Sequence, residues 1–183
     1  MRFLTALLFT LFSFTLNAAD LTRVDVERWI KTYAELQAWL DQHQDQLPEE
    51  EFTNTNLSMD ELRAKGIQQL RDVGLYTEFN RRVQQAGFKN VEHWSLLGQQ
   101  ISLAYIALAL EAEPQSRTMI ETQLKELRAS RDIPAEEKAL YETMLKDSLS
   151  MMRQAERISP ASKAAVRPYQ QQLEELFELE DSY

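Results

Sequence analysis

The residue types that most often carry out chemistry are scarce in this chain. Its 183 residues include two histidines, His43 and His93, and no cysteine. A metal centre needs several converging ligands, and neither histidine has a glutamate three residues before it, as the Glu-x-x-His signature of di-iron helical bundles requires. We therefore expect no metal and no cofactor. We expect His93 to be a surface or partly buried polar residue in the first turn of a helix.

Covalent and acid–base catalysis also lack an obvious set of residues. The sequence contains no Gly-x-Ser-x-Gly motif and no glycine-rich phosphate loop. Carboxylates do occur side by side, at 49–51, 136–137 and 174–175. Adjacent helix positions point about 100° apart, so these carboxylates do not converge on one reacting bond as glycoside hydrolysis requires.

Helix signals recur along the chain, whereas strand signals do not. There are four glycines and five prolines, and apolar residues repeat at spacings of three and four. Thr22 with Asp25, and Ser58 with Glu61, have the side chains that cap a first helical turn. The sequence predicts an all-α fold, a single compact bundle of six or seven mostly antiparallel helices. Their expected ranges are about 23–46, 59–73, 75–86, 91–112, 114–130 and 134–158, followed by a last helix that Pro168 kinks or begins.

The central element of this bundle is the helix expected over about 91–112. It contains the stretch ISLAYIALAL, residues 101–110, which is too short for a membrane span of about 20 apolar residues. The helix is amphipathic at its start and apolar all round at its end, which is typical of a helix that enters the middle of a bundle. Its apolar end, together with the methionine-bearing helix expected over 134–158, could also form the walls of a ligand cavity.

One motif in the central helix resembles a known repeat. Trp94, Leu97, Gly98 and Ile101 have the spacing that opens a tetratricopeptide repeat, over eight residues only. A repeat of that family recurs after 34 residues, and the equivalent later positions hold Arg128, Arg131, Asp132 and Ala135. The sequence therefore predicts that Trp94 and Gly98 are packing residues at a close helix contact.

The helix expected over 134–158 contains several methionines. Its expected buried face is Tyr141, Met144, Leu145, Met152 and Ala155. Methionines are adaptable and could line a groove for a partner or a lipid, although filling gaps in the core is their commoner role.

The first residues have the layout of a secretory signal peptide. Arg2 precedes an apolar run from Phe3 to Leu16, and the small residues Ala18 and Ala19 follow. Such a run rises about 21 Å as a helix, which is less than the roughly 30 Å of a bilayer core. We predict a signal peptide over 1–18, cleaved near Ala18 or Ala19, and a mature domain over 19–183 in the periplasm or secreted.

Composition leaves three hypotheses for function. The net charge of −9 disfavours nucleic acid and anionic membranes as partners. The first hypothesis is an exported soluble protein that binds another, possibly basic, protein as an accessory, inhibitor, immunity or chaperone-like factor of a bacterial envelope. The alternatives are a helical carrier of an apolar small molecule or lipid, and a carboxylate- or metal-dependent enzyme. The expected partner-binding residues are Glu49, Glu50, Glu51 and Phe52, where acidic groups flank one aromatic ring.

Overall fold

A computed structural model of the protein describes residues 20–47 and 58–180, and within these ranges the chain forms helices and no strand. The prediction of an all-α fold is therefore confirmed. The elements are α1 (Arg23–Asp41), η1 (Gln44–Gln46), α2 (Met59–Asp72), α3 (Tyr76–Gln85), α4 (Val91–Ala112), α5 (Ser116–Ala129), α6 (Ala135–Ala155), α7 (Pro160–Val166), η2 (Arg167–Tyr169) and α8 (Gln170–Glu180).

The predicted caps start α1 and α2. The hydroxyl of Thr22 accepts a hydrogen bond from the Asp25 amide at 3.2 Å, and the Asp25 carboxylate accepts one from the Thr22 amide. Ser58 and Glu61 make the same reciprocal pair. Hydrogen bonds from the Ser58 hydroxyl and amide lower the pKa of Glu61 below its ordinary value. Each cap satisfies amide groups that would otherwise lack a partner in the first turn.

Helix α3 ends close to the predicted position, and Gly87 makes the turn that follows it. Gly87 has a φ of +91°, which favours glycine, and Phe88 folds back as a buried side chain whose amide donates to the Val83 carbonyl at 3.2 Å. This turn sends the chain back into α4.

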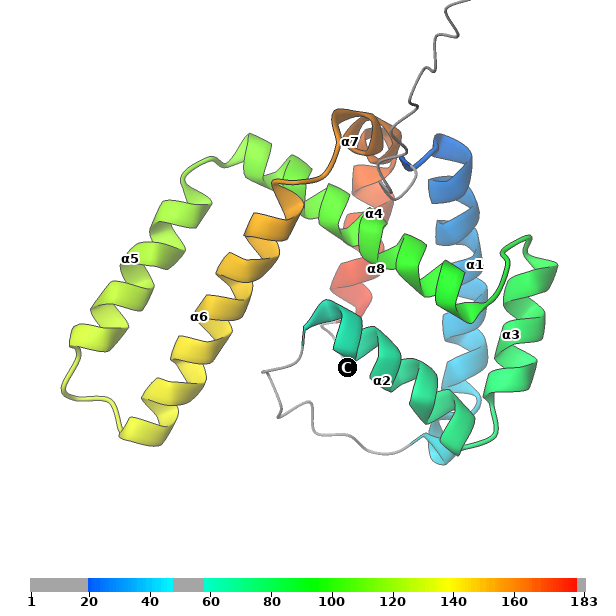
Figure 1. The fold of residues 1–183 in the computed structure, drawn as a ribbon, viewed down its shortest axis with the longest axis horizontal. Helices are drawn as coiled ribbons and strands as arrows, with labels where there is room; N and C mark the ends of the chain where they lie inside the picture. Colours follow the sequence, from blue (N-terminus) through cyan, green and yellow to red (C-terminus); the bar gives the residue numbers. More distant parts are fainter. Residues whose placement is uncertain (1–19, 48–57, 181–183) are drawn as a thin grey trace, which may run out of the picture.

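Helix α4 is the centre of the fold, as predicted (Figure 1). It packs against α1, α2, α3, α6 and α7. Ile101 and Ala104 are completely buried, together with Val26 of α1 and Val83 of α3. Five residues of the apolar decapeptide are therefore core residues, whereas Ala109 is exposed.

The C-terminal helix is bent. Elements α7, η2 and α8 follow one another without a break, and Pro168 lies in η2 at the bend. Proline removes a helical hydrogen bond and crowds the preceding turn. With α7, η2 and α8 counted as one kinked helix, the described chain has seven α-helices, within the predicted six or seven.

Helices α5 and α6 form an antiparallel hairpin that stands to one side of the other helices (Figure 1). A small apolar cluster joins the base of the hairpin to the second half of α4, and its buried members are Leu103, Ala107 and Ala155. A larger cluster of buried residues joins α4 to α1, α2, α3, α7 and α8.

Two local predictions were wrong. The first helix ends at Asp41 rather than near Gln46, and η1 replaces its last turn. On α6, Tyr141 and Met144 were expected to be buried, yet they are 44% and 49% exposed. The reason is the position of the hairpin, since α5 packs on one side of α6 and no described helix covers the side that carries Tyr141 and Met144.

None of the described helices combines the length and the apolar character needed to cross a bilayer. The signal peptide predicted over 1–18 lies outside the described residues.

Candidate functional site

An apolar groove of about 500 Å³ runs between α1, α2 and α4. Its walls come mostly from these three helices, with single contributions from the turn after η1 and from α3. The lining residues are Tyr33, Leu36, Gln37, Leu40, Leu47, Met59, Leu62, Arg63, Gly66, Ile67, Gln69, Leu70, Phe79, Val91, Trp94, Ser95, Gln99 and Ser102.

The lining is suited to binding rather than to proton transfer. Most of these side chains are aliphatic or aromatic, and the polar ones are glutamines and serines apart from Arg63. Arg63 is also the single charged side chain among the described lining residues, and it pairs with Asp60 at 3.0 Å. Pockets that bind small molecules have this composition, a mainly apolar wall with a few polar groups that orient the ligand.

Trp94 is the centre of an aromatic wall. Its ring stacks on Trp29 with centroids 5.8 Å apart and lies edge-to-face with Phe79 at 5.6 Å. Tyr33 stacks on the same indole at 6.4 Å. The Trp29 indole N–H donates to the Trp94 carbonyl at 3.1 Å, which fixes α1 against α4. Such aromatic pairs add about 0.5–1.5 kcal/mol each beyond the burial of their area.

Two helical glycines lie at these walls, and one of them permits a close contact between helices. A Cβ atom at Gly98 would lie 2.7 Å from the Trp29 ring, so the absence of a side chain there permits the close contact of α1 and α4. This confirms that Gly98 is a packing residue at a close helix contact. A Cβ atom at Gly66 of α2 would meet nothing within 4 Å, because Gly66 borders the open groove.

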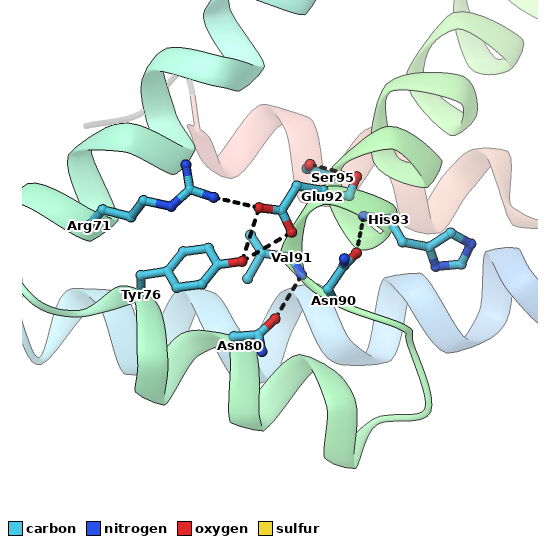
Figure 2. A network of polar contacts seen from close by, with 8 residues as sticks. All are labelled: Arg71, Tyr76, Asn80, Asn90, Val91, Glu92, His93 and Ser95. Atoms are coloured by element: carbon cyan, nitrogen blue, oxygen red, sulfur yellow. Dashed lines mark hydrogen bonds and ion pairs between the residues drawn. The ribbon is translucent and has the colours of Figure 1, made fainter.

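A polar network holds one end of the groove (Figure 2). The Glu92 carboxylate accepts a hydrogen bond from the Arg71 guanidinium at 2.7 Å. The Tyr76 hydroxyl donates to the same carboxylate, 2.9 Å from one oxygen and 3.1 Å from the other. The Arg71 guanidinium also lies over the Tyr76 ring at 4.6 Å. Glu92 of α4 therefore ties together the end of α2 and the start of α3.

The same network orients the start of α4. The Asn80 side-chain oxygen accepts from the Val91 amide at 3.1 Å, and Asn90 caps the helix by accepting from the His93 amide at 2.9 Å. The Val91 side chain is buried at the wall of the groove, whereas His93 is exposed and its ring points away from the network (Figure 2). These bonds fix the register of the residues that α4 contributes to the wall.

Three residues that line the groove each have a buried polar atom without a hydrogen-bond partner. Within the described chain, the buried side-chain atoms that make no hydrogen bond include Trp94 Nε1, Arg63 Nε and Gln99 Oε1, and all three belong to lining residues. A buried donor or acceptor without a partner lowers stability by about 1–3 kcal/mol. A hydrogen bond to water or to a ligand would remove this cost.

The sequence predicted a different set of binding residues. Glu49, Glu50, Glu51 and Phe52 lie outside the described residues. The expected cavity between the end of α4 and α6 is not where the groove lies, since α6 contributes no lining residue. Residues 20–47 and 58–180 hold no group of histidine and acidic residues placed to bind a metal.

Sequence reasoning missed most of the groove. Gly66, an isolated glycine inside a helical pattern, was the available signal, because such a glycine often has a packing or functional reason. The position of Trp94 over α1 depends on tertiary contacts that no local pattern encodes.

No protein-family model matches this sequence, and comparison with curated proteins and with solved structures finds no significant match. Any function must therefore be inferred from the geometry of the groove.

Proposed function

We propose that this protein acts by non-covalent binding, and that the groove between α1, α2 and α4 holds a small molecule with an apolar body and a hydrogen-bond acceptor. The observation that carries the proposal is the coincidence of an apolar groove with unpartnered buried donors on Trp94 and Arg63. An acceptor on the ligand would satisfy these donors, while its apolar body would cover the aromatic and aliphatic wall.

The dimensions agree with this class of ligand. Small-molecule sites occupy about 300–1,000 Å³, and the groove offers about 500 Å³. Burial of apolar surface contributes about 25 cal/mol per Å² to the free energy of binding. The apolar wall would therefore provide most of the affinity, and the polar groups would orient the ligand. The sequence also led to the hypothesis of a carrier, but it placed the ligand between α4 and α6 rather than between α1, α2 and α4.

We also propose that the carrier is exported. Support comes from the leader-like residues 1–18 and from the anchoring of the next residues, where the Leu21 amide donates to the Ser162 hydroxyl at 3.0 Å and the Leu21 side chain is buried. Cleavage near Ala18 or Ala19 would leave this anchored segment intact.

Gly66 gives a direct test of the groove. A phenylalanine at this position would project into the open volume, and Gly66→Phe should weaken binding of the fluorescent probe N-phenyl-1-naphthylamine by about tenfold or more. Fluorescence titration measures this change. Gly66→Ala is the matched control, because it adds one methyl group to the same site and should retain most of the binding.

Both variants should stay folded, since replacing a helical glycine favours the helix. Circular dichroism and thermal unfolding check this. Equal probe affinity in wild type and Gly66→Phe would contradict the proposal. Native mass spectrometry of protein from its own host should further show a bound small molecule that Gly66→Phe lacks.

The first hypothesis from the sequence was binding of another protein. The exposed apolar side of α6, a different surface from the groove, supports that hypothesis. The contact loop expected at Glu49–Phe52 stays a prediction, and deletion of residues 49–54 with recovery of the partner from an envelope extract tests it.

A further inference from the structure

Helix α6 carries more apolar surface than its neighbours cover. Leu149 and Ala155 are buried, but Leu140, Tyr141 and Met144 are 49%, 44% and 49% exposed. We call these three residues the α6 face. Large apolar side chains that cluster on a surface mark interaction sites more often than isolated ones do.

The three residues share one side of the helix. Leu140 and Met144 are four residues apart, and Tyr141 and Met144 are three apart, so their side chains are neighbours. Met151 lies two turns further along the same side and packs in the small cluster with Leu103 and Ala107 of α4. The α6 face therefore lies on the same side of α6 as its interface with α4, but further along the helix, where α4 no longer covers it.

Helix α5 occupies the other side of α6. The Arg128 guanidinium bonds to the Glu142 carboxylate at 2.7 Å, and the Lys138 ammonium bonds to the Arg128 and Ser130 carbonyls at 2.7 and 2.9 Å. Residues 138 and 142 are four apart and point away from Leu140 and Met144 at helical spacing. The α5–α6 contact therefore leaves the α6 face uncovered.

The charges around the α6 face are negative. Glu136, Glu137 and Asp147 are exposed beside it, and none of the three pairs with a cation of the described chain. Lys146, the nearest cation after Met144, already pairs with Glu142 at 2.8 Å on the α5 side. A second copy of this chain would bring the same three carboxylates and the same net charge of −9, so charge complementarity favours a basic occupant instead.

We propose that the α6 face binds a basic amphipathic helix of another protein. The apolar side of that helix would cover Leu140, Tyr141 and Met144, and its lysines or arginines would meet Glu136, Glu137 and Asp147. This is the helix-in-groove mode, in which residues at i, i+3, i+4 and i+7 provide the anchors. The proposal is independent of the groove between α1, α2 and α4.

A synthetic leucine–lysine amphipathic helix of about five turns serves as the probe, with fluorescence anisotropy of a label on the peptide as the measurement. Wild-type protein should bind this peptide, and Met144→Gln with Tyr141→Ser should weaken binding by about tenfold. Both positions are exposed, so these variants should fold. Met119→Gln, at a 51% exposed methionine of α5, is the matched control and should bind as wild type does.

The charges have their own test. Glu136→Lys with Glu137→Lys should weaken binding, and added salt should weaken the wild-type complex more than the variant complex. Gly66→Phe should leave peptide binding unchanged, which separates this surface from the groove. The same peptide with glutamate in place of lysine should not bind.

Equal affinity for wild type and the Met144→Gln, Tyr141→Ser variant would overturn the proposal. Dimerisation by analytical ultracentrifugation that the same variant abolishes would also overturn it, since the occupant would then be a second copy. Binding to phosphatidylglycerol vesicles that the variant abolishes would assign the face to lipid and would equally overturn it.

Discussion

At the scale of single residues, two glycines inside helices have opposite consequences for stability. Gly98 faces the Trp29 ring at a distance that leaves no space for a methyl group, whereas Gly66 faces an open groove. The sequence singled out Gly98 through its spacing from Trp94, and it gave Gly66 no role. Both lie in helices, so propensity alone would treat them alike.

We predict that Gly98→Ala lowers the free energy of unfolding. Overpacking costs about 1–3 kcal/mol, and this loss exceeds the helix-propensity gain of up to about 1 kcal/mol. The midpoint of thermal unfolding should fall by several degrees, at about 2–4 °C per kcal/mol for a chain of this size. An unchanged midpoint would mean that the Trp29 ring moves aside without cost.

We predict the reverse for Gly66→Ala. Its Cβ atom meets nothing within 4 Å, so the helix-propensity gain of about 0.8–1 kcal/mol remains. The unfolding midpoint should rise by about 2–4 °C, and differential scanning calorimetry measures it. A lower midpoint would show that the groove wall has no room at this position.

Glu92 supplies a third test at this scale. Glu92→Gln keeps the size of the side chain but removes the charge that Arg71 and Tyr76 bind at 2.7 and 2.9 Å. Hydrogen bonds to a charged group contribute about 1.5–3 kcal/mol, and exposure of the Arg71 side chain reduces this value. We expect a loss of up to about 1 kcal/mol by urea denaturation and weaker probe binding at the groove. Ser95→Ala, beside it in the groove wall, is the control, with a smaller loss of stability.

At the scale of helices, the sequence predicted which segments are helical better than it predicted which faces are buried. Capping pairs and glycine stops are local, so Thr22, Ser58 and Gly87 mark their boundaries correctly. Burial depends on neighbours: on α6, Tyr141 and Met144 were predicted to be buried and are exposed. No local sequence pattern predicts that α5 and α6 form a hairpin to one side of the other helices.

The hairpin should respond to acid at one carboxylate. Hydrogen bonds from Lys146 and Arg128 lower the pKa of Glu142 from its ordinary 4.5 to about 2. Because the folded pKa is below the unfolded one, the stabilisation is complete above about pH 4.5 and is lost as the pH falls toward 2. Protection factors from hydrogen exchange over α5 and α6 should fall across this window.

Glu142→Gln should lower those protection factors at neutral pH and flatten their pH dependence, while α1 to α3 keep theirs. Glu137→Gln, on the same helix and without an ion pair to a described residue, is the control. The same pH dependence in wild type and Glu142→Gln would show that other carboxylates govern the response. The four-residue spacing of Glu142 and Lys146 on one helix indicates their pair, whereas the Arg128 contact across the hairpin depends on the fold.

At the scale of the whole molecule, composition and pattern were enough to predict an all-α fold around a central α4. Length, few glycines and the apolar decapeptide carried that prediction. The groove could not be predicted from composition and pattern. Its walls combine residues from 33 to 102 on several helices, and the sequence pattern does not give the relative positions of these helices.

Export gives a prediction at this scale. When the full chain is expressed in a Gram-negative host, we expect the protein in the periplasmic fraction with a mature N-terminus at Ala19 or Asp20, as intact mass and N-terminal sequencing would show. Full-length protein beginning at Met1 in the cytosolic fraction would contradict the leader prediction.

The hydrogen bond between the Leu21 amide and the Ser162 hydroxyl spans 141 residues and joins the first described turn to the last helix. Val166 and Leu173 of that C-terminal segment are completely buried in the same core as Val26. A nascent polypeptide that emerges with its N-terminus first therefore lacks part of the surface that covers α1, the part that α7 contributes, until its synthesis is nearly finished. Contacts of such large sequence separation slow folding, and slow folding would suit the export that we propose.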